Sequence, residues 1–294
     1  MKKMYKVLSS TALAAALLSG TIMGSIETAA AKNAAAGTAA QSGITLSISK
    51  AFYDGNYISL TVKRSGKGLS GGMTGGAKGT INSMDILIDG KSISSYGKTP
   101  AQRPSLGWKA EGTDTAVITL ADASWLGGSN KAFPDKFKLT AKIGLEGVSK
   151  PYTFNIPLQK SSKTNVLKPN VTKKSGDLSM TLKQVRAADT SIRLQWVLKG
   201  KDKDQLHDLM YDFVDSKGNK IDFITGSGTD ENNKNGDYYY DYILGGLGSG
   251  VKSITIKPFT AEMKDDESGQ FKTDAKGEIV KNYNKELEIT VSVK

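Results

Sequence analysis

The sequence predicts an all-β protein of two tandem β-sandwich domains behind a cleavable signal peptide. Three observations predict this: alternating apolar and polar residues in many short segments, turn residues between those segments, and a strand pattern that occurs twice. A hydrophobic period of two is typical of strands with one buried face, and about six or seven such strands per copy are typical of a sandwich. No segment of helical length has a clear amphipathic pattern.

The first 31 residues have the order of a secretory signal peptide. Lysines within residues 1–6 precede an apolar stretch at 7–23, and small residues with an Ala-x-Ala pattern follow at 29–31. No later segment approaches the roughly 20 apolar residues that cross a bilayer as a helix. We therefore expect cleavage, a mature protein without a membrane span, and an extracellular or cell-wall-associated location.

Composition shifts divide the rest of the chain. Residues 32–42 are small, polar and without period, so we interpret them as a flexible tether. The polar, proline-containing stretch at 159–170 is the boundary between two sandwich domains, which we assign to residues 43–160 and 161–294.

The repeat is clearest in two hairpin patterns. Residues 44–67 and 178–201 align without gaps, and each block predicts two half-buried strands joined by a polar turn. Ile44, Leu46 and Ile48 fall opposite Leu178, Met180 and Leu182, and Ile58, Leu60 and Val62 fall opposite Ile192, Leu194 and Trp196. The turn of the first block is Asp54-Gly55-Asn56, in which glycine can adopt a positive φ. We interpret the repeat as a duplicated domain.

Composition excludes several kinds of chemistry. The chain has no cysteine, so it can form no disulfide, thiolate zinc site, iron–sulfur cluster or cysteine nucleophile. Its one histidine, His207, is the only possible imidazole base and lies in a polar segment that we interpret as a solvated loop. We expect no cofactor and no enzymatic activity, although composition alone leaves a paired-carboxylate glycosidase open.

Positive charge is concentrated in the first domain. Residues 42–161 contain 15 basic and 8 acidic residues, whereas residues 162–294 contain 21 and 20. Such a surplus favours association with wall polyanions or anionic surfaces without specifying a ligand. Nucleic acid is not an expected partner, because no basic run alternates with aromatic residues.

Aromatic residues are the candidate binding groups. Trp108 and Trp125 lie in irregular sequence and are candidates for an exposed platform, whereas the repeat places Trp196 in the core. Tyr238 and Tyr240 belong to a run that puts aromatic rings on both faces of a strand, so one face is a candidate for exposure. The favoured alternative is a strand buried on both faces. Exposed rings are suited to stacking on sugars or to a protein partner.

Carboxylates gather at Asp230, Glu231 and Asp237, and again at residues 265–267. Calcium takes six to eight oxygen ligands, and loops of this composition can supply them. Neither segment has the spacing of a defined calcium loop, so we predict no metal site and retain Asp230, Glu231 and Asp237 as its candidate ligands.

Once these strands are set out, the chain resembles a known family. The motifs Gly43-Ile44-Thr45 and Tyr53-Asp54-Gly55, with the later segment 253–263, are similar to extracytoplasmic domains of unknown function from spore-forming Gram-positive bacteria. Many members are membrane-anchored and lie downstream of an anti-sigma-factor-like segment. The resemblance implies paired immunoglobulin-like sandwiches and no catalytic residues. The absence of a later membrane helix here departs from the anchored members.

These observations support three hypotheses of function. The first is a secreted, non-enzymatic protein that binds a cell-surface polymer or an extracellular protein through sandwich loops or edges. The second is a carbohydrate-binding module or carbohydrate-active enzyme, and the third is an envelope-stress sensor or modulator. The sequence does not specify the oligomeric state.

Overall fold

A computed structural model describes most of the chain after the predicted signal peptide. The described residues are 37–99, 102–126, 132–161, 163–202, 206, 208–231, 236–264 and 270–293. The predicted signal peptide at 1–31, His207 and the acidic segment at 265–267 lie outside them.

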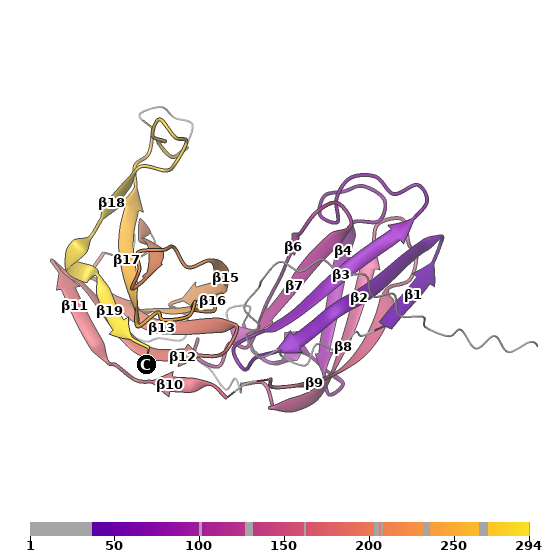
Figure 1. Ribbon diagram of the computed structural model, residues 1–294, viewed down its shortest axis with the longest axis horizontal. Coiled ribbons are helices and arrows are strands. Elements are labelled where there is room, and N and C mark those ends of the chain that lie inside the picture. The colour runs from indigo at the N-terminus through magenta and orange to yellow at the C-terminus, as the bar shows by residue number, and fades with distance from the viewer. Residues whose placement is uncertain are drawn as a thin grey trace, which may run out of the picture.

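The first sandwich consists of two antiparallel sheets with strand orders β1-β2-β3-β7-β6 and β5-β4-β8-β9 (Figure 1). Alternate residues of each strand point between the sheets, and Ile44, Leu46 and Leu139 are fully buried there. The strands are β1 (Gly37–Gln41), β2 (Ile44–Tyr53), β3 (Ile58–Gly66), β4 (Ile81–Ile88), β5 (Lys91–Ser92), β6 (Ser105–Ala110), β7 (Thr115–Ala121), β8 (Lys136–Leu145) and β9 (Tyr152–Gln159).

The second sandwich also has two antiparallel sheets. One has the order β10-β12-β13-β16-β15, with β11 also paired to β12, and in the other β17 pairs with β14, β18 and β19. Its separate core includes Leu182, Trp196 and Ile256. The strands are β10 (Asn165–Leu167), β11 (Val171–Ser175), β12 (Leu178–Ala187), β13 (Ser191–Lys199), β14 (Met210–Asp215), β15 (Phe223–Thr229), β16 (Tyr238–Gly245), β17 (Ser253–Ala261), β18 (Lys281–Tyr283) and β19 (Ile289–Ser292).

The predicted all-β sandwich fold is confirmed, and strand pairing follows the repeat. A β-bulge follows Ile48 in the β2–β3 hairpin and Leu182 in the β12–β13 hairpin, which are aligned positions. An edge strand precedes each hairpin in matching register, with Gly37 opposite Ile48 and Val171 opposite Leu182. The period-two pattern therefore predicted both the strands and their buried faces.

The predicted tether needs correction. Residues 37–41 form β1, which pairs along β2 instead of extending as a flexible linker. Ser42 and Gly43 both adopt positive φ in the tight turn that joins the two strands. Alanine-rich sequence has little strand propensity of its own, so the backbone partner offered by β2 determines this conformation.

A buried ion network joins the two sandwiches, which meet near β7 and β13 (Figure 1). Arg193 on β13 donates to Asp122 of the first sandwich at 2.7 Å and to Asp241 on β16 at 2.6 Å. All three side chains are almost inaccessible to solvent. Because charges are costly to bury without partners, this network requires the sandwiches to stay in contact.

Two hairpin turns extend the same joint. Asp54, in the β2–β3 turn, accepts hydrogen bonds from the hydroxyls of Thr190 and Ser191, each at 2.6 Å. Asn56 donates to the Ser191 hydroxyl at 2.9 Å, and Arg186 donates to the Gly55 carbonyl at 2.8 Å. The turns predicted from the repeat therefore contact each other as well as closing their own hairpins.

Outside the joint, an ion pair links β14 to β18 across the outer face of their sheet. Asp212 accepts from the Lys281 ammonium at 2.7 Å and from the Tyr283 hydroxyl at 2.6 Å. Burial favours the neutral carboxyl, but these hydrogen bonds outweigh it and hold the pKa of Asp212 below its ordinary value. Burial and the nearby carboxylate raise the pKa of Tyr283 to about 12.

Replacement of Arg193 tests the joint. We expect Arg193→Met to lower the free energy of unfolding by about 3–5 kcal/mol, because it leaves two buried carboxylates without a cation. Adding Asp122→Asn and Asp241→Asn to Arg193→Met should recover much of this loss. Urea unfolding measures both effects, and Arg103→Met at an exposed position is the control. If Arg193→Met and Arg103→Met have the same free energy of unfolding, Arg193 does not have the assigned role.

Acid titration tests the β14–β18 ion pair. The folded pKa of Asp212 lies below the ordinary value near 3.8, so its stabilisation is complete above that pH and is lost as pH falls through the folded pKa. In urea unfolding from neutral to acidic pH, Asp212→Asn should therefore destabilise the protein near neutrality. Its difference from the unmodified chain should shrink as the pH falls below about 4. A difference that stays constant with pH would show that Asp212 acts without its charge.

Candidate binding site: an aromatic pocket beside strand β15

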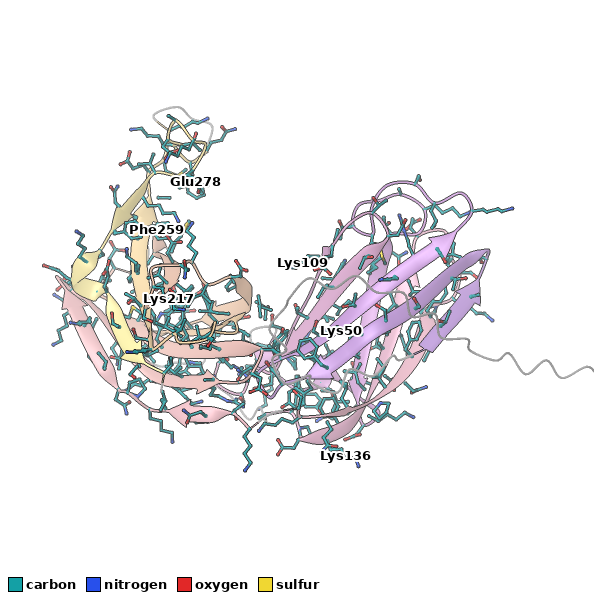
Figure 2. The ribbon with its side chains drawn as sticks, viewed as in Figure 1. Lys50, Lys109, Lys136, Lys217, Phe259 and Glu278 are labelled. Carbon is teal, nitrogen blue, oxygen red and sulfur yellow. The ribbon has the colours of Figure 1, made fainter. Side chains whose placement is uncertain are left out.

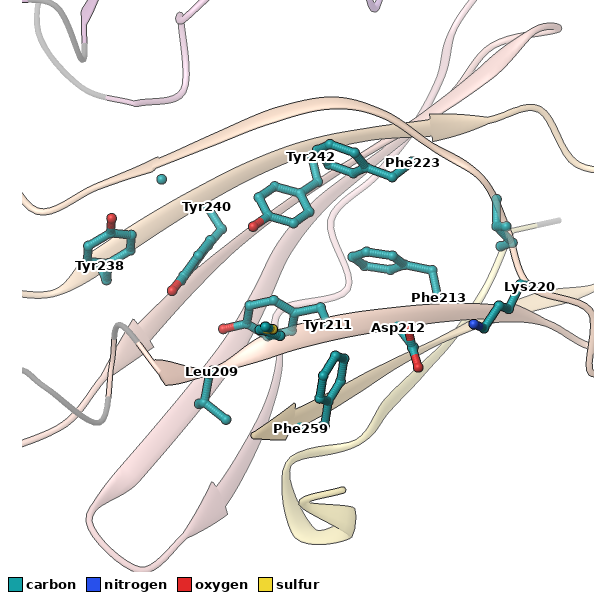
Figure 3. Close-up of a pocket in the computed structure, with 13 residues that line it drawn as sticks. Leu209, Tyr211, Asp212, Phe213, Lys220, Phe223, Tyr238, Tyr240, Tyr242 and Phe259 are labelled. Carbon is teal, nitrogen blue, oxygen red and sulfur yellow. The ribbon is translucent and has the colours of Figure 1, made fainter. Parts of the chain in front are cut away.

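A pocket lined by aromatic rings opens between the sheets of the second sandwich (Figure 3). Its volume is about 560 Å³, within the usual range for small-ligand sites. Strands β14, β15, β16 and β17 supply most of its walls. The lining residues are Leu209, Met210, Tyr211, Asp212, Phe213, Lys220, Ile221, Phe223, Gly228, Tyr238, Tyr240, Tyr242 and Phe259.

Strand alternation places three tyrosines on one wall. Tyr238, Tyr240 and Tyr242 are two residues apart on β16, so their rings share the face that points into the pocket (Figure 3). On neighbouring β15, Gly226 lies opposite Tyr242 and Gly228 lies opposite Tyr240. A Cβ at Gly226 would lie 2.6 Å from the Tyr242 ring, and one at Gly228 would lie 2.5 Å from Tyr238. The two glycines therefore leave room for the rings over β15.

The opposite wall comes from the other sheet. Tyr211 and Phe213 point inward from β14 (Figure 3). Phe259 of β17 pairs with Met210 and lies on the other side of β14, where its ring centroid is 5.7 Å from that of Tyr283. The Tyr211 and Tyr240 rings meet edge to face with centroids 5.2 Å apart. Beneath them, Trp196 stacks on Tyr240 at 5.0 Å and 9°. These contacts give the pocket a closely packed aromatic floor.

The interior of the pocket is uncharged. Burial raises the pKa of Tyr211, Tyr240 and Tyr242, so each phenol stays protonated at neutral pH. Among the described lining residues, the charged ones are Asp212 and Lys220, which lie together at one end (Figure 3). The site can therefore offer ring faces, phenol hydroxyls and one polar end to a ligand.

Phe223 stands at the mouth of this pocket and of a second hollow. Its side chain is 52% exposed, and its ring meets Tyr242 edge to face at 5.1 Å. The second hollow is a groove of about 350 Å³ between the sandwiches, lined by β15 and by outward-facing residues of β3, β6 and β7. Strand β15 therefore separates the aromatic pocket from the inter-sandwich groove.

The structure gives the predicted aromatic residues different environments. Trp108 lines the inter-sandwich groove and is 38% exposed. Trp125 does not form an exposed platform, because it is half-buried with its ring 5.6 Å from Tyr239 in the joint. Tyr238 is half-buried in the aromatic pocket. Tyr240 is not exposed either, since it lies in the core and donates to the Leu206 carbonyl at 3.0 Å.

The candidate metal ligands have other partners or neighbours. Asp237 forms an ion pair with Lys199. Burial raises the pKa of Tyr238, and the nearby negative charge of Asp230 raises it further. The Glu231 amide donates to the Thr229 hydroxyl at 3.1 Å. Within the described ranges, no group of three or more histidine, cysteine or acidic side chains is placed to hold a metal ion.

Sequence reasoning missed the wall opposite the tyrosines. Tyr211 and Phe213 come from β14 of the other sheet, and only tertiary packing brings them opposite the tyrosines of β16. Phe223 reaches the mouth of the pocket from β15, next to β16. One local signal was available: the glycines of Gly226-Ser227-Gly228 have the same spacing of two as the tyrosines of β16. Glycine next to aromatic residues on a neighbouring strand is a known means of accommodating large rings.

Comparisons with solved structures show similarity of fold. The chain resembles the crystal structure of a conserved domain protein from Bacillus anthracis, with a TM-score of 0.57 and 15% identity over 90% of this chain and 92% of that one. Bovine butyrophilin matches over 82% of this chain and 92% of its own at 11% identity, but the TM-score of 0.20 is too low to indicate a shared fold. In the part of the chain that the structure describes, no helix has the length and apolarity to cross a bilayer.

The sandwich that contains the aromatic pocket is similar to a known family. No curated protein matches the chain. Residues 164–291 are similar to a family of unknown function, DUF5643, and this match covers nearly all of the second sandwich.

Proposed function

We propose that this chain is an exported, non-enzymatic protein of the cell envelope that binds a cell-surface polymer in the aromatic pocket. The observation that carries the proposal is the pocket itself, which is lined by aromatic rings and opens at the exposed ring of Phe223. The signal-peptide pattern at residues 1–31 supports export. The resemblance to extracytoplasmic domains agrees with a location outside the cytoplasm.

Carboxylates near the pocket support binding rather than catalysis. Asp212 is held by Lys281 and Tyr283, and Asp241 is held by Arg193. A glycosidase needs two carboxyl groups facing one bond, one as acid and one as base or nucleophile. Asp212 and Asp241 belong to different sheets and each is held by its own hydrogen bonds, so the two do not face one bond.

Pocket chemistry favours an uncharged glycan portion of the polymer. Sugar rings combine apolar faces with hydroxyl groups, which match ring stacking and the phenol groups of Tyr238 and Tyr242. The neutral interior would not compensate a buried phosphate or carboxylate, whose desolvation is costly. We therefore expect affinity from stacking, with little dependence on salt.

Lysines of the first sandwich would add a weaker, salt-sensitive attraction. Lys50, Lys109 and Lys136 project from its surface (Figure 2). Two of the eight carboxylates in that region, Asp54 and Asp122, are buried in the joint, which makes the surface more positive than composition indicates. Long-range attraction of this kind concentrates the protein at anionic walls without selecting a ligand.

Removal of the exposed ring tests the proposal. We expect Phe223→Ala to weaken co-sedimentation with purified Gram-positive peptidoglycan by about tenfold or more, because a stacking anchor is lost. Phe271→Ala is the matched control, since that ring is 40% exposed on the hairpin beyond β17, away from the pocket. Co-sedimentation at roughly 1 M salt, where the Debye length is about 3 Å, separates stacking from charge attraction.

Three outcomes would contradict the pocket as the binding site. They are equal losses in Phe223→Ala and Phe271→Ala, binding that disappears in high salt, and no binding to either peptidoglycan or chitin. Chitin serves as the second polymer because it carries no peptide and no phosphate. Binding to both polymers that depends on Phe223 and persists in high salt would support the proposal.

A further inference from the structure

We propose that the groove between the sandwiches binds an extended peptide segment of a partner protein, which adds as a strand to β15. This site is separate from the polymer site of the aromatic pocket, although Phe223 borders both. Three features suit the groove to a peptide: the open edge of β15, the small residues of the groove floor and the fixed position of its walls.

Strand β15 is an unprotected sheet edge. Among the described residues it pairs only with β16, which leaves the backbone groups of its other edge available. Its seven residues, Phe223–Thr229, include no charged residue and no proline. Proteins usually block exposed edges with lysine, proline or a covering element, because an open edge is a template for another strand. The groove beside β15 is therefore suited to strand addition.

Small residues form the floor of the groove. Ser59, Gly107, Val117 and Thr119 line it from strands β3, β6 and β7. Gly107 is the most open point, since a Cβ there would have only the Thr119 hydroxyl within 4 Å, at 3.7 Å. A peptide backbone can approach such a floor closely, whereas large side chains would prevent it.

The joint holds the walls of the groove in place. The hydroxyls of Ser105 on β6 and Thr225 on β15 lie 3.4 Å apart at one end of the groove. Two residues beyond Thr225, strand β15 passes the buried carboxylate of Asp241, which Arg193 binds. A preformed site reduces the entropy that a bound peptide must lose.

Backbone and charge both favour a peptide over a glycan here. The free groups of β15 repeat with the spacing of a neighbouring strand, about 3.3 Å per residue, which a peptide matches along its length. Lys109 and Glu111 both line the groove and have opposite charges. We therefore expect an extended peptide of uncharged residues whose apolar side chains contact Trp108 and Phe223.

A glutamine at Gly107 tests the site without altering the aromatic pocket. The probe is a phage-displayed library of random linear peptides, selected on the unmodified protein and then measured individually. Gly107→Gln should reduce binding of the selected peptides by about tenfold or more, because its side chain occupies the floor. Gly76→Gln is the matched control, because Gly76 lies in a loop of the same sandwich. A Cβ at Gly76 would have no atom within 4 Å.

Hydrogen exchange gives a second measurement. Bound peptide should slow amide exchange within residues 223–229, because strand addition protects the free edge of β15. Failure to select peptides, selected peptides that bind Gly107→Gln unchanged, or unchanged exchange in β15 would each overturn the proposal. Concentration-dependent self-association that Gly107→Gln abolishes would overturn it in favour of a second copy of this chain. Peptidoglycan binding should persist in Gly107→Gln, so the peptide site and the polymer site can fail independently.

Discussion

The shape of this molecule depends on one buried guanidinium. Arg193 is placed between Asp122 of the first sandwich and Asp241 of its own, with both carboxylates out of solvent. Burial alone would favour neutral forms of all three groups, but their mutual attraction raises the pKa of Arg193 and lowers that of Asp122. Asp241 shares the same cation and keeps a raised pKa, because burial outweighs its part of that attraction. Separating the sandwiches would take Asp122 away from Arg193 and leave that guanidinium with Asp241 alone, so the joint holds one relative position.

Strand β16 connects this joint to the aromatic pocket. One face of β16 is turned toward the first sandwich and carries Tyr239, Asp241 and Ile243. On this face Tyr239 contacts Trp125, Asp241 binds Arg193, and Ile243 packs in the small cluster around Tyr57. The residues between them, Tyr238, Tyr240 and Tyr242, line the pocket. A strand whose two faces are both packed has little freedom to shift register, because a slip of one residue would exchange the two sets. The ion network therefore also fixes where the pocket rings stand.

Sequence periodicity predicted the strands and hairpins but not what covers their outer faces. Arg193 and Asp241 have the alternation of a solvated face, and a period of two cannot distinguish water from a second domain. Trp125 was a candidate for exposure because it lies in irregular sequence, and the tyrosine run on β16 was a candidate for a strand with one exposed face. Asp122 and Arg193 are 71 residues apart in the sequence and meet only at the joint between the two sandwiches. The pocket was likewise not predictable beyond its tyrosines, because its opposite wall comes from another sheet.

Different side chains at aligned positions of the two hairpins give each face a different use. In the ungapped repeat, Arg193 falls opposite Ser59 and Trp196 falls opposite Val62. Where the second copy has the joint's guanidinium, the first has a small hydroxyl that lines the inter-sandwich groove. Where the second copy has an indole that stacks beneath the pocket, the first has Val62, which is fully buried in the core of the first sandwich. A shared hairpin frame thus carries the joint and the aromatic pocket in one copy and the groove floor in the other, through changes in side-chain size and charge at aligned positions.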